Sequence, residues 1–105
     1  MTLKVFTTAD EKNLAVKYIN TSKTNTVYVK NIGTAPVTLY RVLLSNTDML
    51  FTVTKDEFGE GSSDTLITND LILPGQTLKL YLSNKKEVSN IIATESLVGI
   101  TLEYV

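Results

Sequence analysis

The sequence predicts an all-β protein, built as an antiparallel sandwich of about seven to eight short strands. Short apolar stretches recur roughly every 10 to 14 residues, with turn-forming residues between them. Val, Thr, Leu, Ile and Tyr are frequent, as they are in sheets. No long stretch keeps the 3.6-residue period of an amphipathic helix. A small jelly roll with the same number of strands is the alternative.

Most of these stretches alternate apolar and polar residues, a pattern that turns one face of a strand toward a core. The expected strands span residues 2–7, 14–19, 26–32, 37–45, 49–54, 65–73, 77–82 and 97–105. Within the sixth, Asn69 and Asp70 indicate a bulge or a split into two pieces. Residues 83–96 are polar. Their pattern is compatible with a helical turn, with a loop and with an arm that becomes ordered on assembly.

The stretch 27–45 is the expected centre of the fold. Its first strand alternates, with Val27 and Val29 toward the core, whereas its second strand is apolar on nearly every position of both faces. The intervening segment NIGTAP contains Asn, Gly and Pro, the residues that turns use. We therefore expect a core-forming hairpin here.

Composition limits the function. The chain of 105 residues is the size of one domain, so we take 1–105 as a single β-sandwich domain. It contains no Cys and no His, which excludes disulfides, thiolate nucleophiles, most hydrolase triads and most transition-metal sites. We expect a protein that is not an enzyme and that uses no cofactor, no metal and no small-molecule substrate.

Charge and hydropathy limit the classes of partner that the protein can have. The formal net charge is −1 with basic residues spread along the chain, whereas nucleic-acid binding leaves a strongly basic footprint. No apolar run approaches the ~20 residues of a membrane span. The N-terminal sequence MTLKVFTTADEK lacks the charged and apolar segments of a signal peptide. We therefore expect no nucleic-acid partner, no membrane insertion and no signal peptide.

The longest polar stretch, residues 55–64, contains Asp56, Glu57, Glu60 and Asp64. Such carboxylates can bind Ca²⁺ or, as a pair, act as acid and base. The spacing lacks the alternate oxygen positions of an EF-hand, and a flexible loop would not hold two carboxylates in place. We therefore interpret this stretch as a solvated surface loop.

The candidate functional residues are side chains suited to contact with another protein. Tyr28, Tyr40 and Tyr81 fall on rows opposite the expected core rows, and Tyr is enriched at protein interfaces. The row formed by Tyr40, Val42 and Leu44 is too apolar for a face left in water. Either a second layer of this chain covers that row or another molecule does, and we expect a contact to another molecule.

Arg41 lies in an apolar row of the same strand, where a charge is costly unless it is paired. One interpretation is that its head reaches a carboxylate or carbonyl group at the edge of the sheet. The other is a contact to a neighbouring subunit. Arg41 therefore joins Tyr28, Tyr40, Val42, Leu44 and Tyr81 as a candidate interface residue.

The pattern VYVKNIGTAPVTLYRVLLS, followed later by LILPGQTLKLYL, resembles immunoglobulin-like sandwich modules of cell-surface, pilin-like and virion proteins. The matching residues, in a region covering about half of the chain, are Asn31, Gly33, Pro36, Val37, Leu73, Pro74, Gly75, Thr77, Leu78 and Leu80. The sequence departs from antibody-type domains because it has no Cys pair and no Trp. The resemblance implies an immunoglobulin-like fold and an adhesive or structural module.

A role in a virion would be consistent both with this resemblance and with the absence of Cys from the chain. Virion proteins fold inside the host cytoplasm without disulfides or a signal peptide, and they work outside the cell. We therefore expect a capsid-decorating, neck or tail accessory protein of a bacteriophage or similar virus, located in the virion. Its partners would be other virion proteins or copies of itself. The alternative is an extracellular module of a surface layer or pilus.

Overall fold

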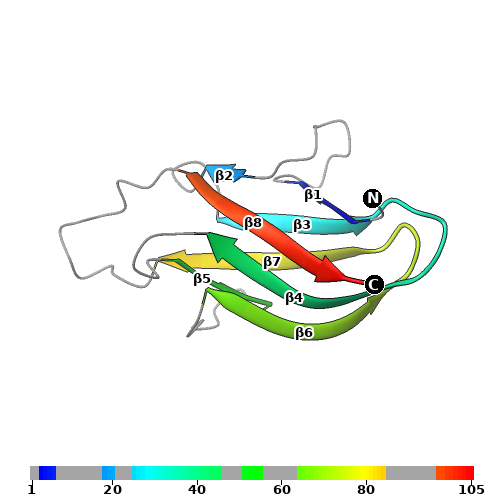
Figure 1. Ribbon diagram of the computed structural model, residues 1–105. Coiled ribbons are helices and arrows are strands. Elements are labelled where there is room, and N and C mark those ends of the chain that lie inside the picture. Colours follow the sequence, from blue (N-terminus) through cyan, green and yellow to red (C-terminus); the bar gives the residue numbers. More distant parts are fainter. Residues whose placement is uncertain (1–2, 7–17, 21–24, 46–50, 56–63, 85–96) are drawn as a thin grey trace.

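The computed structural model describes residues 3–6, 18–20, 25–45, 51–55, 64–84 and 97–105. These residues form eight strands and no helix, so none of them belongs to a helix that could cross a membrane (Figure 1). The strands are β1 Leu3–Phe6, β2 Tyr18–Asn20, β3 Thr26–Asn31, β4 Val37–Ser45, β5 Phe51–Thr54, β6 Thr65–Ile72, β7 Thr77–Asn84 and β8 Leu97–Tyr104.

The strands form two antiparallel sheets that pack face to face. Sheet A has the order β1-β3-β7-β5, and sheet B has the order β2-β8-β4-β6. Figure 1 shows β8 and β4 of sheet B in front of β3 and β7 of sheet A. The predicted all-β antiparallel sandwich is confirmed. Each described strand lies in the sheet opposite to the strand before it, because odd-numbered strands form one sheet and even-numbered strands the other.

The predicted hairpin over residues 27–45 is wrong. Its two strands are β3, which pairs with β1 and β7 in sheet A, and β4, which pairs with β6 and β8 in sheet B. The connecting residues 32–36 bridge the sheets at the end of the sandwich where residues 73–76 also cross (Figure 1). Loops of this length also close hairpins, so turn residues alone do not distinguish the two connections.

The side chain of Asn31 holds these two bridging loops together. It is fully buried at the end of β3. Its amide nitrogen Nδ2 donates hydrogen bonds to the carbonyl oxygens of Ala35 and Ile72, each at 2.9 Å. Its Oδ1 accepts a hydrogen bond from the Gly33 N–H, also at 2.9 Å. A buried amide with three partners replaces its lost water contacts, so Asn31 fixes both crossings.

The backbone of Asn31 makes two more bonds that extend the pairing of β3 with β7 in sheet A. Its N–H donates to the Gln76 carbonyl oxygen at 3.1 Å, and its carbonyl oxygen accepts from the Gly75 N–H at 2.9 Å. Gly75 has φ of 82°, a left-handed conformation that glycine adopts without a Cβ penalty. The Pro-Gly turn therefore presents its N–H to β3, the neighbour of β7 in sheet A, where the chain enters that sheet.

Strand β4 contains a bulge at Tyr40. In the pairing with β8, Leu39 lies opposite Tyr104 and Arg41 lies opposite Glu103, so Tyr40 has no counterpart. A bulge of this kind adds one residue to a strand and reverses which later side chains face inward.

The neighbouring edge strand β6 is irregular at the same level. Leu39 lies opposite Asp70 and Arg41 lies opposite Ile67, so β6 has two residues where β4 has only Tyr40. One of these two is Asn69, whose φ of 51° makes it the one non-glycine residue with a left-handed backbone in the described part of the chain. The predicted irregularity at Asn69 is confirmed as a bulge.

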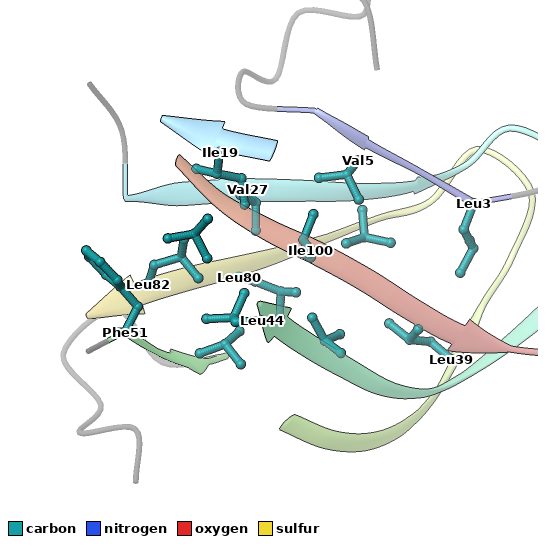
Figure 2. Close-up of a cluster of buried hydrophobic side chains, with 14 of the residues drawn as sticks. Leu3, Val5, Ile19, Val27, Leu39, Leu44, Phe51, Leu80, Leu82 and Ile100 are labelled. Carbon is teal, nitrogen blue, oxygen red and sulfur yellow. The ribbon is translucent and has the colours of Figure 1, made fainter. Parts of the chain in front are cut away.

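The core lies between the two sheets and is apolar (Figure 2). At about 1.5–3 kcal/mol for each fully buried Val, Leu, Ile or Phe, this cluster supplies the main stabilisation of the sandwich. The expected inward orientation of Val27 and Val29 on β3 is confirmed. The buried apolar residues are Leu3, Val5, Ile19, Val27, Val29, Val37, Leu39, Val42, Leu44, Phe51, Val53, Ile72, Leu80, Leu82, Val98 and Ile100.

Candidate interaction surfaces

The bulge at Tyr40 places two of the expected interface residues in the core. Val42 has no exposed surface and Leu44 is 5% exposed, and both belong to the buried cluster. The interpretation of Tyr40, Val42 and Leu44 as one outward row is therefore wrong. Before the bulge Val37 and Leu39 face inward, and after it Val42 and Leu44 do, so sheet A covers that row.

Tyr40 and Arg41 are exposed at the bulge, on the outer face of sheet B. Arg41 Nε and Nη2 donate hydrogen bonds to Glu103 Oε2 at 2.9 and 2.6 Å, across the β4–β8 pair. The interpretation that the Arg41 head meets a carboxylate is confirmed. The two side chains are 49% and 41% exposed, so water screens their charges and we expect this ion pair to add about 0–1 kcal/mol to stability.

Large exposed apolar side chains on strands all belong to sheet B in the described part of the chain. Two of them are on β6, where Ile67 is 69% exposed and Leu71 is 62% exposed. Tyr40, on the adjacent strand, lies at a level between them, because Arg41 is opposite Ile67 and Thr38 is opposite Leu71. We call Tyr40, Ile67 and Leu71 the apolar surface of sheet B.

Sequence reasoning missed Ile67 and Leu71. The stretch TLITNDLIL is apolar at positions of both parities, so the sequence does not show which residues face outward. In the structure the strand alternates regularly from Leu66 to Ile72, so Ile67 and Leu71 share the outer face whereas Ile72 is buried.

Two further exposed apolar residues, Tyr18 and Leu97, lie on β2 and β8 at the other end of the same sheet. Tyr18 is opposite Gly99, and a Cβ atom at Gly99 would lie 3.5 Å from the Tyr18 ring and 3.2 Å from the Cβ atom of Ser45. The contact with the Tyr18 ring would be ordinary van der Waals contact, whereas the contact with Ser45 would be tight, so the close approach of Ser45 favours glycine at this position.

Tyr28 and Tyr81 lie together on the outer face of sheet A. Tyr28 on β3 is opposite Lys79 on β7, and Tyr81 is two residues further along β7. The ammonium group of Lys79 lies 5.8 Å from the centroid of the Tyr28 ring and 5.2 Å from that of Tyr81. Both distances fit cation–π contacts. The expected outward orientation of both tyrosines is confirmed, and Lys79 is a member of the group that the sequence did not reveal.

An open pocket of about 410 Å³ lies where β6 and β7 approach each other, and Lys55, Asp70, Gln76 and Leu78 contribute to its lining. Asp70 Oδ2 accepts hydrogen bonds from the Thr68 hydroxyl and, at 3.2 Å, from Lys55 Nζ. The hydrogen bond from Thr68 is the main cause that lowers the pKa of Asp70. Partial burial raises this pKa, and the hydrogen bond and charge of Lys55 lower it further. Asp70 is therefore held as a carboxylate by structural partners.

The acidic stretch 55–64 is described only at its two ends, and residues 56–63 lie outside the described part of the chain. At its end, the Asp64 carbonyl oxygen accepts a hydrogen bond from the Leu44 N–H at 2.8 Å, which ties it to β4. No group of three or more possible metal ligands occurs among the residues that the structure describes.

Comparisons of the chain with protein-family models, with curated proteins and with solved structures find no match.

Proposed function

We propose that this chain is a non-enzymatic structural protein that acts through protein–protein contacts, with the apolar surface of sheet B as its main interface. The exposure of Ile67 and Leu71 on one strand carries this proposal, because exposed apolar side chains that gather on one face favour association with another protein. Tyr40 beside them adds a large side chain of a type enriched at interfaces.

The contact uses side chains of the sheet face rather than the backbone of the edge. Strand β6 is an edge strand, but the bulge at Asn69 interrupts its line of hydrogen-bonding groups. Bulges and charged side chains such as Asp70 are common means by which edge strands avoid pairing with other strands. A face-to-face contact that covers Ile67 and Leu71 needs no such pairing.

As in the sequence-based expectation, we propose that the protein is part of a virion, as a capsid-decorating, neck or tail accessory protein. Its partners would then be copies of itself or other virion proteins. Mass spectrometry of purified virions, compared with the envelope fraction of the producing cells, tests this location. Enrichment in virions supports it, and enrichment in the envelope fraction would favour a surface-layer or pilus module instead.

Sedimentation velocity tests the interface itself. We expect the protein to self-associate, or to bind a capsid or tail protein in a pull-down, and we expect Ile67→Asp to weaken that contact by about tenfold or more. Ile67 is exposed, so its replacement should change stability by no more than about 0.5 kcal/mol. Ile32→Asp is the matched control, because Ile32 is also exposed but lies in the loop that connects β3 to β4, outside the apolar surface of sheet B.

Two results would contradict the proposed interface. One is a protein that stays monomeric at high concentration and captures no capsid or tail protein. The other is an Ile67→Asp variant that associates as tightly as the unmodified chain.

A further inference from the structure

The outer face of sheet B has one positive and one negative side chain, and the two are paired. The charged residues on the described strands of this sheet are Arg41, Asp70 and Glu103. Asp70 belongs to the inner side, because it lies opposite the buried Leu39 and accepts a hydrogen bond from Lys55, which directly follows β5 of sheet A. Arg41 and Glu103 therefore give the outer face no net charge, and a neutral face does not repel a second copy of itself.

Apart from this pair, the described strands of sheet B present uncharged residues outward. On β8, Val98 and Ile100 are buried, so the alternate positions 97, 99, 101 and 103 face outward. On β6, Ile67 and Leu71 face outward beside Tyr40 of β4. The centres of protein interfaces are depleted of charged side chains and enriched in aromatic ones. The face therefore has the composition of a surface that a second sheet can cover.

The ion pair on this face uses only part of its hydrogen-bonding capacity. Arg41 Nε and Nη2 both donate to one oxygen, Glu103 Oε2, at 2.9 and 2.6 Å. Within the described part of the chain, Arg41 Nη1 and Glu103 Oε1 take part in no hydrogen bond or ion pair. A guanidinium group has five N–H donors, and each oxygen of a carboxylate can accept a hydrogen bond. A donor and an acceptor therefore remain for a second molecule.

The position of the pair fits a two-fold axis. Strands β8 and β4 are the two inner strands of sheet B, whose order is β2-β8-β4-β6 (Figure 1), and Arg41 is directly opposite Glu103 across them. An axis that runs parallel to these strands, midway between them, places β4 of one copy on β8 of the other. Because a two-fold interface uses the same patch on both copies, Arg41 of each copy then faces Glu103 of the other.

We propose that the outer face of sheet B binds a second copy of this chain face to face, with Arg41 and Glu103 of the two copies forming one cluster of four alternating charges. The apolar side chains supply most of the affinity, and the charges select the partner and its orientation. A partner whose charge at this place had a single sign would bring a like charge to one member of the pair. This inference rests on the proposed function, since it names the partner of the interface proposed there.

Charge reversal in the full chain tests this inference, with sedimentation velocity as the measurement. Arg41→Glu and Glu103→Arg each bring like charges together in the contact, so we expect either variant alone to self-associate about tenfold or more weakly than the unmodified chain. An equal mixture of the two variants brings opposite charges together again, and its association should return to within about threefold of the unmodified chain. Lys4→Glu reverses a charge in sheet A, the other layer, and should have little effect.

The mixture also separates a lost contact from a folding defect. Each variant chain keeps its own two like charges whether or not the other variant is present, so mixing does not repair a chain that fails to fold. Circular dichroism should show that both variants fold, because the Arg41 and Glu103 side chains are partly exposed.

Three outcomes would overturn the inference. The first is a mixture that associates as weakly as the two variants do separately, and the second is single variants that associate as tightly as the unmodified chain. The third is a monomeric protein that captures a capsid or tail protein and loses it on Ile67→Asp, which would leave the proposed interface in place with a different partner. A chain that neither self-associates nor captures a protein would contradict the proposed function as well, so the two failures are distinguishable.

Discussion

The side-chain amide of Asn31 donates a hydrogen bond to the carbonyl oxygen of Ile72, although the two residues are 41 positions apart in the chain. Asn31 ends β3 in sheet A, and Ile72 ends β6 in sheet B. The bond therefore links the two sheets at the end where both bridging loops cross. All of its side-chain partners are backbone atoms, so these hydrogen bonds depend on the course of the backbone and not on which side chains the neighbouring residues have.

We expect Asn31→Ala to lower the free energy of unfolding by about 2–4 kcal/mol. The change leaves the buried carbonyl group of Ile72 and the partly buried groups of Gly33 and Ala35 without their partner, and a fully buried group of this kind costs about 1–3 kcal/mol. Urea denaturation measures the effect, with Asn25→Ala at an exposed position as the control. A loss no larger than that of the control would show that water replaces the amide.

The bulge at Tyr40 gives two nearby positions opposite tolerance to charge. Val42→Glu should destabilise the protein by more than about 4 kcal/mol, because it places an unpaired carboxylate in the apolar core. Tyr40→Glu should change stability by less than about 1 kcal/mol, since Tyr40 is exposed. Thermal unfolding of the two variants measures this difference. Without a bulge, Tyr40 and Val42 would share a face and respond alike, so equal effects would contradict the bulge.

Asp70 should make stability depend on pH at the acidic end. Its pKa is lower in the folded protein than in the unfolded chain, chiefly because of the Thr68 hydroxyl, so the carboxylate stabilises the fold above the unfolded pKa of about 4. That contribution is lost as the pH falls through the folded pKa. Asp70→Asn should therefore be less stable than the unmodified protein near pH ~6 and approach it at pH ~3 or below.

Nuclear magnetic resonance titration of the Asp70 carboxyl group separates the causes. Thr68→Val and Lys55→Gln should each raise the pKa of Asp70, because the Thr68 hydrogen bond is its largest single cause and Lys55 adds both a hydrogen bond and a charge. A larger rise in Lys55→Gln would show that the ion pair dominates. A stability difference between Asp70→Asn and the unmodified protein that stays constant over the acidic range would show that Asp70 has the same pKa in both states.

Strand positions and inward rows were largely predictable, because alternation is a local property of the chain. Val27 and Val29 on β3 and Leu80 and Leu82 on β7 are buried as their pattern predicts. The bulge in β6 was also predictable, since Asn tolerates the left-handed backbone that Asn69 adopts.

The candidate surfaces were predictable only in part. Tyr28 and Tyr81 were expected to face outward, but their shared contact with Lys79 depends on the pairing of β3 with β7. Arg41 was expected to find a carboxylate or carbonyl group, but Glu103 becomes its partner only through the β4–β8 register. Cross-strand neighbours are set by which strands pair, and that information is not local.

By itself, the sequence determined an all-β chain with short alternating strands and the turn residues that separate them. Only the tertiary structure decided which sheet each strand joins. In this protein no two consecutive described strands are neighbours in a sheet, whereas in constant-type immunoglobulin sandwiches several consecutive strands are. It also decided that β4 reverses its inward face at Tyr40, which buries Val42 and Leu44. The physical reason is that a turn or a bulge is stabilised by contacts made across the sandwich, as Asn31 makes with Ile72.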